Sequence, residues 1–104
     1  MNSNQIIKNI HSKTNERGYS VPQDYFVGIT SNPEERIFNE HNINREESFY
    51  TFFEASTELD AKKAFEKLLK YNMHGFPSLG NIPGKFVYCY YIEGTSKECY
   101  TSFE

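Results

Sequence analysis

In the first half of the chain, a cationic side chain and an imidazole follow a strand-like stretch of sequence. Arg36 follows Gly28 by eight residues and precedes His41 by five. A guanidinium offers parallel donors that match phosphate oxygens, and it can meet the negative charge that builds during phosphodiester cleavage. Two ordinary roles compete with this chemistry. Arg36 could pair with Glu40 along a helix, and His41 could complement the dipole at a helix C-terminus.

The elements expected to position these residues alternate between helices and strands. The sequence predicts helices over 3–17, 33–41 and 58–71 and strands over 24–29, 49–55 and 86–92, with a short fourth strand over 98–103. Asn32 and Thr57 are suited to cap the second and third helices, since an acidic residue follows each three positions later. We expect one domain, 1–104, of the α/β (α+β) class, with a small, mostly antiparallel sheet flanked by helices.

The stretch around Arg36 resembles a known nuclease family. It reads Tyr25-Phe26-Val27-Gly28-Ile29-Thr30-Ser31-Asn32-Pro33-Glu34-Glu35-Arg36, followed by Glu40-His41. This is similar to the "YIG" half of the GIY-YIG nucleases, in which a strand ending in Gly precedes an arginine helix. The order of strand, arginine helix, strand and glutamate helix extends the resemblance over about residues 24–70.

The resemblance implies a site for phosphodiester hydrolysis. Arg36 corresponds to the catalytic arginine, His41 lies near the place of a family histidine, and Glu66 corresponds to the metal-binding glutamate. A single carboxylate suits Mg²⁺, which keeps most of its waters and binds the substrate phosphate. A tyrosine such as Tyr25 would act on the attacking water as a general base. Further side chains are candidates for substrate binding: Lys62, Lys63, Lys70, Tyr88 and Tyr90.

The sequence departs from the family pattern in its tyrosines. No "GIY" strand precedes Tyr25, and Phe26 stands where the family has the "YIG" tyrosine. Strand 86–92 could fill the missing place as in a circular permutation, with Tyr88 and Tyr90 on one face and Cys89 and Tyr91 on the other, and one of these pairs could bring a hydroxyl near Arg36. Alternatively, this strand pairs with 98–103 as a hairpin at the sheet edge and its tyrosines serve the core.

The helix over 58–71 also has a simpler interpretation. Its apolar residues recur at helical spacing and predict a buried face, on which Leu68 is central. Glu66 then lies on the flank, where salt bridges with neighbouring lysines are the ordinary outcome. The lysines Lys62, Lys63, Lys67 and Lys70 would form a solvated face.

Composition limits the classes of protein that fit. The net charge is −3 over 104 residues, which argues against a protein that coats nucleic acid, although the lysines leave room for a local basic face. No apolar run is long enough to cross a bilayer, so we expect no membrane association. Two cysteines, Cys89 and Cys99, favour a cytoplasmic protein with free thiols. His11 and His74 lack partners at zinc spacing.

Three functions follow from these residues. The first is a Mg²⁺-dependent nuclease centred on Arg36 and Glu66. The second, favoured because the expected tyrosines are missing, is a non-catalytic module that binds a nucleotide, nucleic acid or a protein partner. The third is a small interaction or inhibitor protein that forms homo-oligomers through an aromatic edge strand. Catalysis requires Arg36 and Glu66 in one concave face, whereas an oligomer requires an uncovered strand edge.

Overall fold

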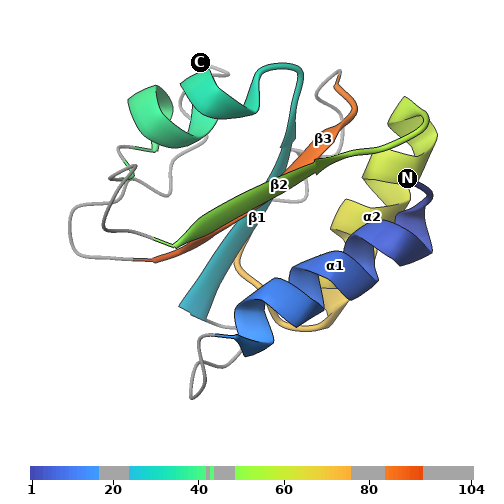
Figure 1. The fold of residues 1–104 in the computed structure, drawn as a ribbon, viewed down its shortest axis with the longest axis horizontal. Coiled ribbons are helices and arrows are strands. Elements are labelled where there is room, and N and C mark those ends of the chain that lie inside the picture. Colours follow the sequence, from blue (N-terminus) through green and yellow to red (C-terminus); the bar gives the residue numbers. More distant parts are fainter. Residues whose placement is uncertain (17–23, 42, 44–48, 76–83, 93–104) are drawn as a thin grey trace.

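The computed structural model describes residues 1–16, 24–41, 43, 49–75 and 84–92. In chain order the elements are α1 (Ser3–Asn15), β1 (Tyr25–Thr30), η2 (Glu35–Glu40), β2 (Tyr50–Glu54), α2 (Glu58–Lys70) and β3 (Phe86–Tyr91). The three strands form one antiparallel sheet, with α1 and α2 on one side and η2 on the other (Figure 1). The predicted α+β class with a small antiparallel sheet is confirmed. Residues 98–103, predicted as a strand, lie outside the described residues.

β3 is the central strand of the sheet, whose order is β1-β3-β2. It pairs antiparallel with β1, where Tyr88 faces Gly28, and with β2, where Tyr88 faces Phe52. The strand predicted over 86–92 therefore lies beside β1, as the permutation requires. The alternative that placed it at the sheet edge is wrong, because β1 and β2 occupy both of its sides.

The pleat of the strands gives the sheet two different faces. Directly paired residues share a face, so Phe26, Gly28, Tyr88 and Tyr90 point to the side that carries η2, here called the η2 face. The alternate residues Val27, Cys89 and their neighbours point toward α1 and α2, on what we call the α face. Tyr25 belongs to this second set, since its hydroxyl donates to the Thr14 carbonyl of α1.

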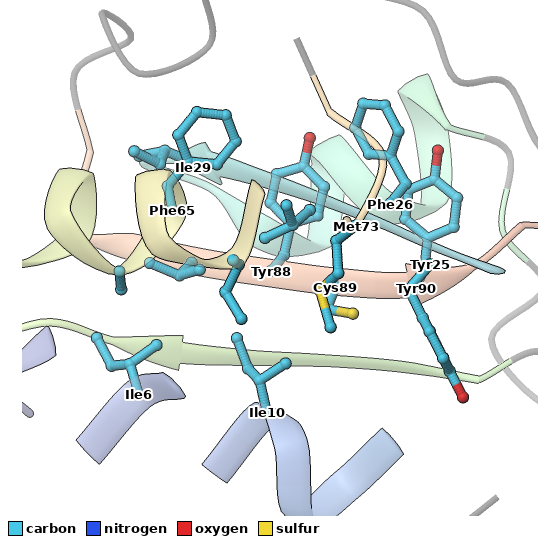
Figure 2. Close-up of a cluster of buried hydrophobic side chains, with 14 of the residues drawn as sticks. Ile6, Ile10, Tyr25, Phe26, Ile29, Phe65, Met73, Tyr88, Cys89 and Tyr90 are labelled. Carbon is cyan, nitrogen blue, oxygen red and sulfur yellow. The ribbon is translucent and has the colours of Figure 1, made fainter. Parts of the chain in front are cut away.

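The two α-helices begin with side-chain caps and bury regular apolar stripes. Asn2 and Gln5 form a capping box at α1, and the Thr57 hydroxyl accepts a hydrogen bond from the Asp60 amide at α2. Their buried faces consist of Ile6, Ile7, Ile10 and Thr14 in α1 and Ala61, Ala64, Phe65 and Leu68 in α2. Figure 2 shows Ile6 and Ile10 of α1 and Phe65 of α2 packed on the strands. Leu68 is fully buried, as the helical periodicity predicts.

Burial also defines the environment of Cys89, which lies inside the core as a free thiol. The predicted free state of the cysteines is thus met at Cys89, whereas Cys99 lies outside the described residues. In the part of the chain that the structure describes, no helix has both the length and the hydrophobicity needed to cross a bilayer.

Candidate functional site

Four side chains of the η2 face form one buried hydrogen-bonded cluster. The Arg36 Nε–H donates to the Tyr88 hydroxyl oxygen over 3.2 Å. The same oxygen lies 2.8 Å from His41 Nε2, and His41 Nδ1 lies 3.0 Å from the Tyr90 hydroxyl. Tyr88, Tyr90 and His41 are fully buried, and Arg36 is only 4% exposed. We call these four residues the Arg36 cluster.

The π-helical geometry of η2 explains why Arg36 and His41 reach the same phenol. The His41 amide donates to the Arg36 carbonyl, a bond that spans five residues rather than four. In an α-helix, residues five apart would lie about 140° apart around the axis. The wider turn of the π-helix brings Arg36 and His41 onto nearly the same face of η2. The sequence predicted an α-helix over 33–41, and this is corrected to a π-helix over Glu35–Glu40.

The N-terminus of η2 is held by the residue that the sequence identified as a cap. The Asn32 side-chain oxygen accepts from the Glu35 amide at 3.3 Å, and the Asn32 carbonyl accepts from the Arg36 amide at 3.1 Å. The Glu35 carboxylate accepts from the Asn32 side chain rather than from its backbone amide, so the capping box is incomplete. These bonds fix the direction in which Arg36 leaves the backbone.

Gly28 makes room for the central phenol. A β-carbon at this position would collide with the ring carbons and the hydroxyl of Tyr88. The Tyr88 ring can therefore lie across β1 and carry its hydroxyl to η2 only because residue 28 has no side chain. The glycine of the YIG-like motif has a packing role here, which the resemblance alone did not state.

Phe26 completes the cluster with its ring rather than with a hydroxyl. It stacks on Tyr90 with ring centroids 5.3 Å apart and lies 5.0 Å from the His41 ring. The hydroxyl that meets His41 Nδ1 comes instead from Tyr90, on the neighbouring strand β3. The permuted interpretation of 86–92 requires a hydroxyl near Arg36, and Tyr88 provides one.

The hydrogen bonds of the cluster allow two arrangements of protons. Tyr88 can donate to His41 Nε2 while His41 Nδ1–H donates to Tyr90, or both bonds can run in reverse. In either case the guanidinium N–H stabilises any negative charge on the Tyr88 oxygen. Protons can therefore pass between Tyr88 and Tyr90 through the His41 ring without leaving the cluster. Its burial, however, leaves the four side chains almost no contact with solvent.

Glu66 lies apart from this cluster. It occupies an exposed position on α2, which packs on the α face, so the sheet lies between Glu66 and Arg36 (Figure 1). Among the described residues, no three His, Cys, Asp or Glu side chains come together at one place. The residues present do not fit a Mg²⁺ ion held by Glu66 beside Arg36.

The remaining candidates divide between the two faces. Tyr25 is buried on the α face, away from Arg36, and its hydroxyl bonds α1. Tyr88 and Tyr90 are buried within the Arg36 cluster rather than open to a substrate. Lys62, Lys63 and Lys70 are exposed on α2. The structure thus brings together Arg36, His41, Tyr88 and Tyr90 and leaves Glu66, Tyr25 and the lysines elsewhere.

Comparison with known proteins adds no relative. The chain matches no model of a known family, no curated protein and no solved structure.

Proposed function

We propose that the chain is a permuted, degenerate GIY-YIG-like domain that serves as a non-catalytic module binding single-stranded nucleic acid. Two features support the permuted fold. β3, which follows the glutamate helix in sequence, pairs with the YIG-like strand β1 and occupies the place of the missing strand. It also presents Tyr88 to Arg36, which restores the tyrosine–arginine pair that Phe26 breaks.

The position of Glu66 carries the non-catalytic part of the proposal. Phosphodiester cleavage of the family type needs the arginine and the metal-binding carboxylate on the same phosphate. In this chain the sheet separates Arg36 from Glu66 (Figure 1). Arg36 instead binds Tyr88, and its burial excludes a bulky polynucleotide. Arg36 and His41, two of the residues that correspond to the family's site, hold the η2 face together here.

The exposed surface of α1 and α2 is the proposed contact for nucleic acid. The two helices carry six exposed lysines, Lys8, Lys13, Lys62, Lys63, Lys67 and Lys70. Only three acidic residues accompany them, so the two helices hold a charge of +3 within a chain of net charge −3. Phosphate backbones bind such surfaces through the release of counterions.

An aromatic side chain lies at the same surface. Tyr71, which directly follows α2, is 49% exposed, and its ring meets the His11 ring of α1 edge to face at 4.9 Å. Lys67 and Lys70 immediately precede it in the last turn of α2. Because exposed aromatic rings stack with unpaired bases, this combination favours single strands over duplexes.

Binding of fluorescein-labelled single-stranded oligonucleotides, followed by anisotropy over a range of salt concentrations, tests the proposal. Lys67→Gln and Lys70→Gln should each weaken binding and reduce the salt slope by about 0.7. Tyr71→Ala should cost about 1–3 kcal/mol of binding free energy. Lys85→Gln is the matched control, since this exposed lysine precedes β3 and lies outside the two helices. Absence of measurable binding at low salt would contradict the proposal.

A Mg²⁺-dependent nuclease remains the second candidate, favoured by the bond between Arg36 and Tyr88. Incubation of labelled DNA and RNA with the protein and Mg²⁺, with and without a chelator, separates the two functions. We expect no cleavage. Chelator-sensitive cleavage that Glu66→Gln abolishes would establish the nuclease instead. Glu66 is exposed, so this variant should fold normally.

A further inference from the structure

The outer side of β2 exposes unpaired backbone groups. The bonds from the Tyr91 amide to the Phe49 carbonyl and from the Ala55 amide to the Lys85 carbonyl set the phase of the β2–β3 ladder. Odd-numbered residues of β2 thus bond β3, while the N–H and C=O groups of Tyr50, Phe52 and Glu54 point outward. The Glu54 carbonyl accepts from the Met1 ammonium group. At Tyr50 and Phe52, no described residue binds the outward groups.

This edge lacks the features that usually protect an exposed strand. β2 reads YTFFE and contains no proline, glycine or lysine, and its one charge comes at the end. Its first four residues are half-buried, and no described element lies across its outer side (Figure 1). Such an edge is a template for another strand.

The opposite edge of the sheet is already engaged. On β1, the Val27 amide donates to the His74 carbonyl at 2.9 Å, and the His74 amide donates to the Tyr25 carbonyl at 2.8 Å. The segment around His74 therefore covers this part of β1. Among the described residues, the outer side of β2 is therefore open to strand addition, whereas the opposite edge is occupied where β1 begins.

We propose that β2 pairs with β2 of a second copy of the chain, antiparallel about a two-fold axis at Thr51, to form a continuous six-stranded sheet. Tyr50 of each copy then exchanges both backbone hydrogen bonds with Phe52 of the other, which satisfies all four outward groups on each strand. The pairing ends before Glu54, whose carbonyl already has the Met1 ammonium as its donor. This inference is independent of the proposed function.

A second copy fits this edge for two reasons. The aromatic rings are held in place before pairing, since Tyr50 packs edge to face on Phe38 and Phe52 on Phe86. Two-fold pairing sets Tyr50 of one copy beside Phe52 of the other, a favourable cross-strand aromatic pair. Because the opposite edge of the described sheet is occupied where β1 begins, the association closes at two copies rather than growing into a filament.

Sedimentation velocity and light scattering on the intact chain test the pairing. The mass should be twice 12.2 kDa and fall toward one chain on dilution. Phe52→Pro should give a monomer, because it removes an outward N–H without touching the bonds to β3. Phe52→Leu, which keeps that N–H, should remain a dimer more readily than Phe52→Pro. Circular dichroism of both variants shows whether they are folded. A wild-type chain that stays monomeric at all accessible concentrations, or that forms open-ended filaments, would overturn the proposal.

Two further measurements test the pairing of β2 strands without a proline substitution. Hydrogen exchange in the wild-type chain should show protection of the Tyr50 and Phe52 amides that increases with protein concentration; concentration-independent fast exchange would contradict pairing. In a Cys89→Ala, Cys99→Ser background, which removes the thiol paired with Thr51 in the same chain, Thr51→Cys should form a disulfide dimer on oxidation, because the two Thr51 residues face each other on the axis. Phe53→Cys, on the same strand face, should cross-link much less. Equal cross-linking at both positions would rule out the proposed register.

Discussion

The Arg36 Nε–H donates to the hydroxyl of Tyr88, a residue 52 positions later in the chain. This bond joins η2 to the central strand and lies in the interior. A charged group is buried at a cost, so its hydrogen bonds matter more to stability than those of a surface arginine. The bond also links the segment after β1 to β3, the strand that pairs with β1. The stability of the η2 face should therefore depend on the Tyr88 hydroxyl.

Removal of the two tyrosine hydroxyls should have unequal effects. Among the described residues, Tyr88→Phe deprives both Arg36 and His41 of a buried partner atom, whereas Tyr90→Phe deprives His41. Each buried group that loses its partner costs about 1–3 kcal/mol. Urea denaturation should therefore show a larger loss of unfolding free energy for Tyr88→Phe. Equal losses would show that the Arg36 bond contributes nothing measurable.

Gly28→Ala should destabilise the protein by displacing the Tyr88 ring. The added methyl group would overlap that ring, and overpacking of this kind typically costs about 1–3 kcal/mol. Thermal or urea unfolding measures the loss. Ser31→Ala, at an exposed position just after β1, is the control and should change the unfolding free energy by less than about 0.5 kcal/mol.

A combination of Gly28→Ala with Tyr88→Phe tests the cause of that loss. The two residues face each other across the strands, so their effects should not add. If the double variant loses the full sum of the two single effects, the methyl group leaves the bonds of the Tyr88 hydroxyl intact and does not displace it.

Most helices and strands could be predicted because their signals are local. Asn32 and Thr57 both cap as expected, and Leu68 follows from helical periodicity alone. The tyrosine alternation in 86–92 also indicated which residues share a face. The π-helix was not predictable in this way, since its five-residue turn depends on where Arg36 and His41 find partners in the folded sheet.

The spacing of residues along the sequence could not decide whether Glu66 lies near Arg36. Its place on α2 was predicted correctly, but periodicity does not specify the face of the sheet on which a helix packs. Burial of Arg36 was also unforeseen, because a sequence does not show that Tyr88 and Gly28 create an enclosed place for a guanidinium. A glycine opposite a tyrosine on paired strands is the signal that would have pointed to it.

Two leucines of α2 provide a matched test of its packing. Leu68 is fully buried against the sheet, whereas Leu59 is 60% exposed on the same helix. Leu68→Ala should lower the unfolding free energy by about 2–5 kcal/mol because it leaves a cavity. Leu59→Ala should change it by less than about 0.5 kcal/mol. Similar effects of the two substitutions in urea denaturation would mean that α2 does not dock as described.

Cys89 should be chemically silent in the folded protein. The thiol is enclosed in the core, and desolvation raises its pKa far above the ordinary range. In a Cys99→Ser background, a thiol reagent should react with Cys89 only at the rate of unfolding, and denaturant should release the reaction. Fast labelling of the native protein would show that the core around Cys89 opens readily.

The same burial makes stability depend on alkaline pH. In the unfolded chain the thiol loses its proton as the pH passes about 9, while the folded protein keeps it neutral. The unfolded state then binds fewer protons, so this contribution to stability is intact below about pH 9 and is lost as the pH rises further. The slope should reach about 1.4 kcal/mol per pH unit for this one group.

Denaturation curves of the wild type and Cys89→Ala between neutral and alkaline pH isolate the effect, since the other titrating groups are common to both. The difference in unfolding free energy between them should stay constant up to about pH 9 and shrink above it; a difference that stays constant throughout would mean that Cys89 ionises as easily in the folded protein as in the unfolded chain.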